Sequence, residues 1–148
     1  MLKQEISFVD FRGNKKTKTY YFNMTRTNLA EMEMDNGGVL RARLEMIMEN
    51  RDAYGMAKFF RQMIVNSYGV PSEDGESFDH GKNHSLGEEF TKTAAFDVFF
   101  RELLSDPEGK KAEAFIYGII PKDVADEARA NTVPNITVDD GLQVIETQ

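Results

Sequence analysis

The hydrophobic pattern of the chain changes near residue 25, from one typical of strands to one typical of helices. Residues 5–11 and 17–22 are rich in β-branched and aromatic side chains, a composition that favours strands. Between them, Gly13 and Asn14 tolerate the positive φ angles of tight turns. We therefore expect a basic β-hairpin over residues 1–24. It must pack on another surface, because an isolated hairpin is only marginally stable.

From residue 25 onward, apolar side chains recur every three or four positions, which is the spacing of one helix face. Four residues that commonly cap helix N-termini stand before such stripes, namely Thr25, Ser85, Thr93 and Asp106. The longest apolar stripes cover residues 29–32, 40–48, 56–64, 96–104 and 112–119. Together they predict a mainly α-helical region over residues 25–121.

Two segments lack a clear pattern. Residues 70–84 are rich in Pro, Ser, Gly, Asp and His, which predicts a long surface loop. Residues 122–148 hold few large side chains and predict a flexible acidic tail, with one helical turn over residues 124–130. The predicted fold class is α+β. An N-terminal β-hairpin packs on a mainly α-helical region in a single domain, residues 1–121, and the tail follows.

Composition limits the classes of function. The 148 residues suffice for one domain with its own core, and the absence of cysteine excludes disulfides, thiolate metal sites and cysteine nucleophiles. No apolar run approaches the length of a membrane span, so we expect a cytoplasmic protein without a membrane partner.

The charge is unevenly distributed along the chain. Residues 1–26 hold six cations and two anions, a net charge of +4, and since the whole chain carries −7, the rest carries −11. The basic segment from Arg12 to Lys18, with Tyr20 and Tyr21 beside it, is the best candidate for nucleic-acid binding. Because that binding depends on a surplus of cations, the strongly acidic remainder argues against it, and we expect no nucleic-acid partner.

The sequence offers little for catalysis. It contains no phosphate-binding glycine loop, no nucleophile elbow and no His-Glu-x-x-His motif. His80 and His84 lie in the predicted loop without a third strong metal ligand at a suitable spacing, so solvated loop histidines are the simpler interpretation. Asp139 and Asp140 fall in the predicted tail, where no pocket would raise a carboxyl pKa for acid catalysis. We therefore predict no catalytic residue, cofactor or metal.

The order of several short segments resembles the tail assembly chaperone family of long-tailed bacteriophages and prophages, especially those of Gram-positive hosts. The resemblance covers residues 5–121 and begins with the basic hairpin, which Phe-Asn-Met-Thr (22–25) and Leu-Ala-Glu-Met-Glu-Met (29–34) follow. Its most specific parts are Ser-Tyr-Gly (67–69) followed by Ser-Glu-Asp-Gly (72–75), and Gly-Ile-Ile-Pro (118–121). Three further runs agree in order, at residues 64–66, 89–96 and 115–117.

The resemblance implies a non-enzymatic role. Members of the family bind the long helical tape measure protein and keep it soluble in the host cytoplasm while tail tube subunits assemble around it. They are shed, and so are not expected in the mature virion. In many such phages a ribosomal frameshift also produces a longer form of the chaperone. Many weakly binding copies would be needed along one client, so avidity would matter more than the affinity of a single site. A homo-oligomer is a separate expectation.

The partner-binding residues expected from the sequence are apolar side chains that fall outside the core stripes. Eight methionines in a chain of this length also fit an adaptable contact surface. The expected contact residues are Tyr21, Met34, Met46, Val65 and Tyr117.

Three alternatives to the chaperone hypothesis remain open at this point. The chain could be a structural tail component that stays in the virion, or a small acidic protein-interaction module. The third alternative is a small hydrolase built around Asp74, His80 and His84.

Overall fold

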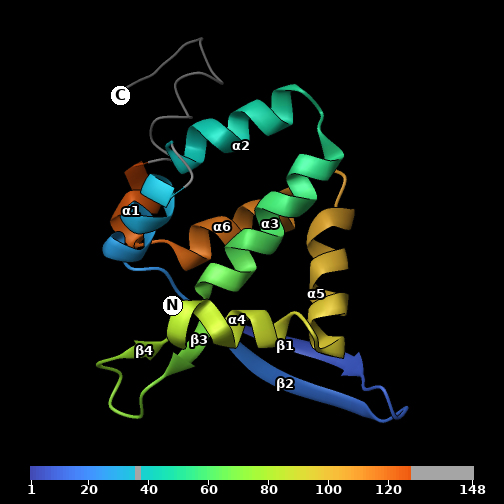
Figure 1. The fold of residues 1–148 in the computed structure, drawn as a ribbon. Coiled ribbons are helices and arrows are strands. Elements are labelled where there is room, and N and C mark those ends of the chain that lie inside the picture. Colours follow the sequence, from blue (N-terminus) through green and yellow to red (C-terminus); the bar gives the residue numbers. More distant parts are fainter. Residues whose placement is uncertain (36–37, 128–148) are drawn as a thin grey trace.

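The computed structural model describes residues 1–35 and 38–127 and confirms the predicted α+β fold. One face of a four-stranded antiparallel sheet is covered by helices, and α4 and α5 pack directly on the strands (Figure 1). The elements are, in chain order, β1 (Leu2–Val9), β2 (Lys15–Phe22), α1 (Arg26–Asp35), α2 (Leu40–Glu49), α3 (Ala53–Ser67), β3 (Tyr68–Pro71), β4 (Phe78–Asp79), the 3-10 helix η1 (Lys82–His84), α4 (Ser85–Phe90), α5 (Ala94–Ser105) and α6 (Lys110–Ile119).

The predicted β-hairpin is confirmed, although β1 covers residues 2–9 where 5–11 was expected and β2 begins at residue 15, two residues earlier than expected. Leu2 pairs with Phe22, and the antiparallel register continues to Val9 opposite Lys15. The turn is held by Asp10, whose carboxylate accepts hydrogen bonds from the backbone N–H groups of Arg12 and Asn14, each at 2.9 Å. Gly13 has a φ of 90°, the conformation that its lack of a side chain permits.

The long loop predicted over residues 70–84 is not what the structure shows. This segment instead forms a second hairpin of β3 and β4, followed by η1. It joins the first hairpin because β3 pairs with the end of β2, opposite Tyr21 and Phe22. The strands are four and two residues long, so they carry too little alternation to be recognised in the sequence.

Two of the four predicted helix caps are confirmed. Thr25 and Thr93 each accept a hydrogen bond from the backbone N–H three residues ahead, at the starts of α1 and α5. The prediction that Asp106 caps a helix beginning at Pro107 was wrong, because α6 begins at Lys110 and Gly109 is its cap residue. The Asp106 carboxylate instead holds the turn before α6, where it accepts hydrogen bonds from the N–H groups of Glu108 and Lys111. The prediction for Ser85 was wrong, because α4 begins at this residue and His84 occupies the cap position in a left-handed conformation, without a side-chain cap.

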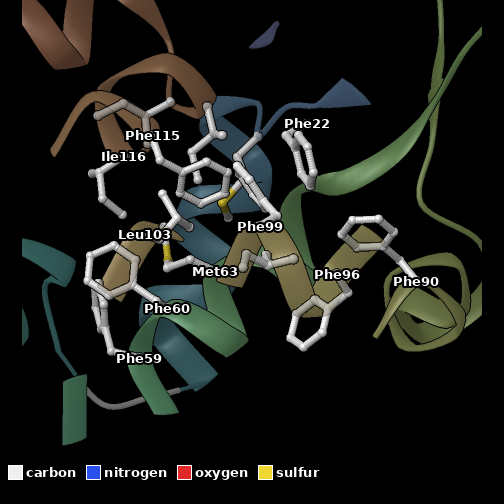
Figure 2. Close-up of a cluster of buried hydrophobic side chains, with 14 of the residues drawn as sticks. Phe22, Phe59, Phe60, Met63, Phe90, Phe96, Phe99, Leu103, Phe115 and Ile116 are labelled. Carbon is white, nitrogen blue, oxygen red and sulfur yellow. The ribbon is translucent and has the colours of Figure 1, made fainter. Parts of the chain in front are cut away.

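The core lies between the sheet and the helices and is dominated by phenylalanine. Phe22 is fully buried and stacks on Phe99, with ring centroids 5.4 Å apart, while Phe90 and Phe115 meet it edge to face (Figure 2). Such aromatic pairs stabilise a fold beyond the area that they bury. One side chain from β2 thereby connects three helices to the sheet.

The structure describes six residues beyond Pro121, at which the predicted domain ends. Residues 122–127 are helical, Ala125 is buried, and Asp123 forms an ion pair with Arg26 at the start of α1. The start of the predicted tail is therefore attached to the domain, through Val124 and Ala125 and through the ion pair of Asp123. The remainder of that tail lies outside the described residues.

Candidate binding surface

Five of the exposed large apolar side chains lie on α1, just before and on α2, and in the first turn of α3. They are Met34, Val39, Met46, Met48 and Tyr54, each more than half exposed, and we call them the α1–α3 surface. In Figure 1 these elements lie at the opposite side of the molecule from the sheet. Large apolar residues in such number on neighbouring helices are typical of a surface that contacts another protein.

The geometry of α2 explains why its methionines are exposed. Leu40 is buried, and Leu44 and Ile47 pack against the core from the same face, since these three positions fall on one side of a helix with 3.6 residues per turn. Met46 and Met48 flank this face on its two sides. The main contact of α2 is with α3 alone, so both flanks stay open to solvent. The apolar side of α2 is therefore wider than the part that the core covers.

The five predicted contact residues lie on five different elements. Met34 in α1 and Met46 in α2 are exposed and belong to the α1–α3 surface. Tyr21, Val65 and Tyr117 are half-buried in β2, α3 and α6. α4 lies close to the backbone of Val65, so that a Cβ atom added at Gly87 would overlap the Val65 carbonyl oxygen. Their role in binding stays a prediction.

Sequence reasoning missed three members of the α1–α3 surface. Met48 falls in the apolar stripe predicted over residues 40–48, although it is 59% exposed. Val39 precedes α2, and Tyr54 lies in the first turn of α3. The spacing of Met48 from Leu44 is helical, so only the narrow contact between α2 and α3 distinguishes it from a core residue.

A second, smaller apolar region lies on the outer side of α5. Val98, Phe100 and Leu104 line a shallow depression there, together with Arg101, Glu102 and Ser105. Phe100 also stacks on Phe96 of the core, with centroids 5.2 Å apart, so part of its ring serves the fold.

The sequence predicted that the two histidines are solvated loop residues, and this prediction was wrong. Both are half-buried, and their ring centroids are 5.8 Å apart. His80 donates from Nδ1 to the carbonyl oxygen of Tyr68 over 2.9 Å and packs against Phe78. His84 has a buried Nδ1 atom without a hydrogen-bond partner among the described residues. His80 thus connects β4 to β3 through a structural contact.

The carboxyl groups with shifted pKa values serve turns and caps. Hydrogen bonds from the backbone of Asn14 and then from Lys16 lower the pKa of Asp10 to about 2. The hydroxyl of Ser72 lowers the pKa of Asp74, and the backbone N–H of Lys111 lowers that of Asp106. A general acid needs a raised pKa, so none of these three fits that role.

Further sites are absent from the described part of the chain. Within residues 1–35 and 38–127, no three side chains of the metal-ligating types come together. In the same residues no helix is long and apolar enough to cross a membrane. Asp139 and Asp140 lie outside the described residues.

Comparison with known protein families identifies the chain. A family model described as phage tail assembly chaperone matches residues 1–147. The chain belongs to the phage tail assembly chaperone family. No curated protein and no solved structure matches it. The match extends over the hairpin, the helices and the predicted tail alike, and so it includes residues 122–147, which the resemblance noted above left out.

Membership of the chaperone family gives the α1–α3 surface its significance. The family is not a class of enzymes, and its members act through contacts with tail proteins. For such a chaperone, the exposed methionines are the best candidates for the contact surface because flexible thioether side chains repack around different apolar partners.

Proposed function

We propose that this chaperone binds the tape measure protein of its phage and keeps it soluble in the host cytoplasm until tail tube subunits assemble around it. Family membership supports the general role in tail assembly. The observation that carries the proposal further is the α1–α3 surface, where five large apolar side chains stand exposed on neighbouring helices. A long client with apolar helical stretches offers the complementary surface.

Client binding through the α1–α3 surface has a simple physical basis. A helix of the client laid beside α2 would cover one of the flanks formed by Met46 and Met48, as amphipathic helices do in apolar grooves. Each covered methionine would contribute about 1.5–3 kcal/mol of apolar burial. Outward-facing charges on the same helix, such as Glu45 and Glu49, would keep the complex in solution.

A co-expression experiment tests this proposal. The tape measure protein from the same genome is produced alone, with the wild-type chain, and with the Met46→Glu/Met48→Glu variant. We expect the client to be insoluble alone, soluble with the wild type, and mostly insoluble with the variant, because a carboxylate at either flank resists burial. Lys92→Glu, which changes the net charge by the same two units at an exposed position between α4 and α5, is the matched control and should act like the wild type.

The experiment also separates the alternatives. A client whose solubility does not respond to the wild-type chain would contradict the proposed function. If both the wild type and the double variant keep the client soluble, the proposed function stands, but the contact surface lies elsewhere on the chain. Stoichiometric amounts of the chain in purified virions would instead support a structural component retained in the tail.

A further inference from the structure

The last segment of the chain begins beside the α1–α3 surface. Residues 128–148 lie outside the described residues and follow directly on the last of them. The helical residues just before this segment are fixed in place, because Asp123 pairs with Arg26 at the start of α1 and Ala125 is buried (Figure 1). The segment therefore leaves the described structure next to α1, the helix that carries Met34 of the α1–α3 surface.

The segment is long enough to reach every part of that surface. It has 21 residues, which is 148 less 127, and a fully extended chain of that length spans roughly 70 Å. Helices of ten residues, such as α1 and α2, are only about 15 Å long. The end of α1 also lies close to the start of α2, since the Leu40 N–H donates to Glu33 Oε2 over 2.6 Å. Distance does not limit a contact between the segment and the surface.

The segment carries apolar side chains in a pattern that suits an apolar surface. Its two alternating runs are Ile-Thr-Val (136–138) and Leu-Gln-Val (142–144). In an extended chain, alternate side chains point to the same side, so each run presents two apolar side chains together. The β-branched residues of these runs also favour extended conformations. The segment thus offers apolar side chains to the exposed methionines of the α1–α3 surface.

The charges of the segment and of the surface also match. Asp139 and Asp140 stand between the two apolar runs. Arg51, in the turn between α2 and α3, is exposed and forms no ion pair with the described residues. Lys58 is likewise exposed, and its ammonium group lies 5.3 Å from the centre of the Tyr54 ring. Two cations at the edge of the surface can therefore face the two anions of the segment.

We propose that residues 128–148 fold back over the α1–α3 surface and cover its methionines while no client is bound. The segment begins beside this surface, reaches all of it and complements its apolar and charged side chains. Because it is part of the same chain, its effective concentration at the surface is of the order of millimolar. That tether favours the segment over any separate protein in dilute solution, and a covered surface is less prone to aggregation.

The cover has a consequence that rests on the proposed function. The client and the segment would compete for the same side chains, so the segment would leave the surface when the tape measure protein binds. The contact itself belongs to the free chain, and its test needs no client.

Oxidation of methionines by dilute hydrogen peroxide tests the cover in the purified full chain. Peroxide transfers one oxygen atom to the thioether, which gives the sulfoxide and water, and an accessible sulfur reacts faster than a covered one. Mass spectrometry of peptides measures the rate at each methionine. Met1 is exposed and serves as the reference, while Met24 and Met63 are buried and report whether the chain is folded. We expect the methionines of the α1–α3 surface to oxidise several-fold more slowly than Met1.

Two full-length variants identify what covers the surface. Ile136→Asp/Val144→Asp places a carboxylate in each apolar run, and it should raise the rates of the surface methionines to that of Met1, because a carboxylate resists burial. Thr137→Asp/Gln143→Asp is the matched control, since it adds the same two charges at the neighbouring polar positions. The control should keep the wild-type rates, and Met24 should stay protected in both variants.

Four results would overturn the proposal. The first two are surface methionines that oxidise as fast as Met1 in the wild type, and equal rates in the apolar-run variant and its control. Protection that grows with protein concentration would assign the cover to a second copy, and rapid oxidation of Met24 in the apolar-run variant would assign the segment to the core. None of these measurements involves the tape measure protein, so their failure leaves the proposed function standing.

Discussion

At the scale of single residues, a close backbone approach fixes how two of the helices pack. Gly87 in α4 lies against the Val65 carbonyl of α3, with no room for a side chain. The sequence gives no sign of this contact, because a glycine inside a short helical segment has no distinguishing pattern. By contrast, the roles of Thr25 and Thr93 followed from the sequence, since caps act on backbone atoms only three residues away.

Gly87→Ala is expected to destabilise the protein by about 1–3 kcal/mol, as overpacking does in well-packed interiors. The added Cβ would overlap the Val65 carbonyl oxygen, so α4 must move away from α3. Chemical denaturation measures the effect. Gly38→Ala is the control, because a Cβ there meets nothing within 4 Å. Equal stability of the two variants would show that α4 does not pack against α3 in this way.

Asp10 is expected to titrate well below an ordinary aspartate. Hydrogen bonds from the Asn14 backbone and from Lys16 lower its pKa to about 2, from an ordinary value of 3.8. Because the folded pKa is depressed, the carboxylate stabilises the turn fully above pH 4, and this contribution disappears as the pH falls toward 2. Carbon NMR of the side chain follows the titration. A midpoint near 4 would mean that the turn is not formed as described.

At the scale of elements, the sequence predicted helices and the first hairpin well because their patterns are long. It failed for β3 and β4, whose strands are set by pairing with β2 over only a few residues. The sequence also did not show which of two neighbouring aromatic residues in one helix is the more deeply buried. In α5, Phe99 is buried against Phe22 and Phe115, whereas Phe100 is half-buried at the edge of the surface depression.

Phe99→Ala is expected to cost about 3–5 kcal/mol, the range for fully buried aromatic side chains. Phe100→Ala should cost less, because part of its ring already faces solvent and only Phe96 stacks on it. Thermal unfolding of both variants gives the comparison. A larger loss of stability for Phe100→Ala than for Phe99→Ala would mean that α5 turns Phe100, and not Phe99, toward the core.

The segment after Pro121 is expected to contribute modestly to stability. A chain ending at Pro121 loses the burial of Ala125, the packing of Val124 and the ion pair between Asp123 and Arg26. We expect it to unfold cooperatively but about 1–2 kcal/mol less stably than a chain ending at Glu127, on the basis of the apolar area lost. Urea denaturation of the two truncated chains is the test, and a chain ending at Pro121 that fails to fold would refute the expectation.

At the scale of the whole molecule, the chain combines a phenylalanine core with an apolar surface that its own described residues leave uncovered. The core and the fold class could be predicted from the sequence, because buried residues recur at the regular spacing of a helix face or a strand face. The α1–α3 surface could be predicted from the sequence only in part. Met34 and Met46 were found as exceptions to the stripes, while Met48 was hidden within one. Only the three-dimensional structure shows that the apolar stripe of α2 extends beyond the residues that the core covers.

The central claim is that this member of the phage tail assembly chaperone family acts by coating the tape measure protein. The most direct test is the mass of the complex that the two proteins form when they are co-expressed and purified together, determined by light scattering. The account predicts a soluble complex with several chaperone copies on each tape measure protein. The absence of any complex, with the tape measure protein equally soluble in its own right, would contradict it.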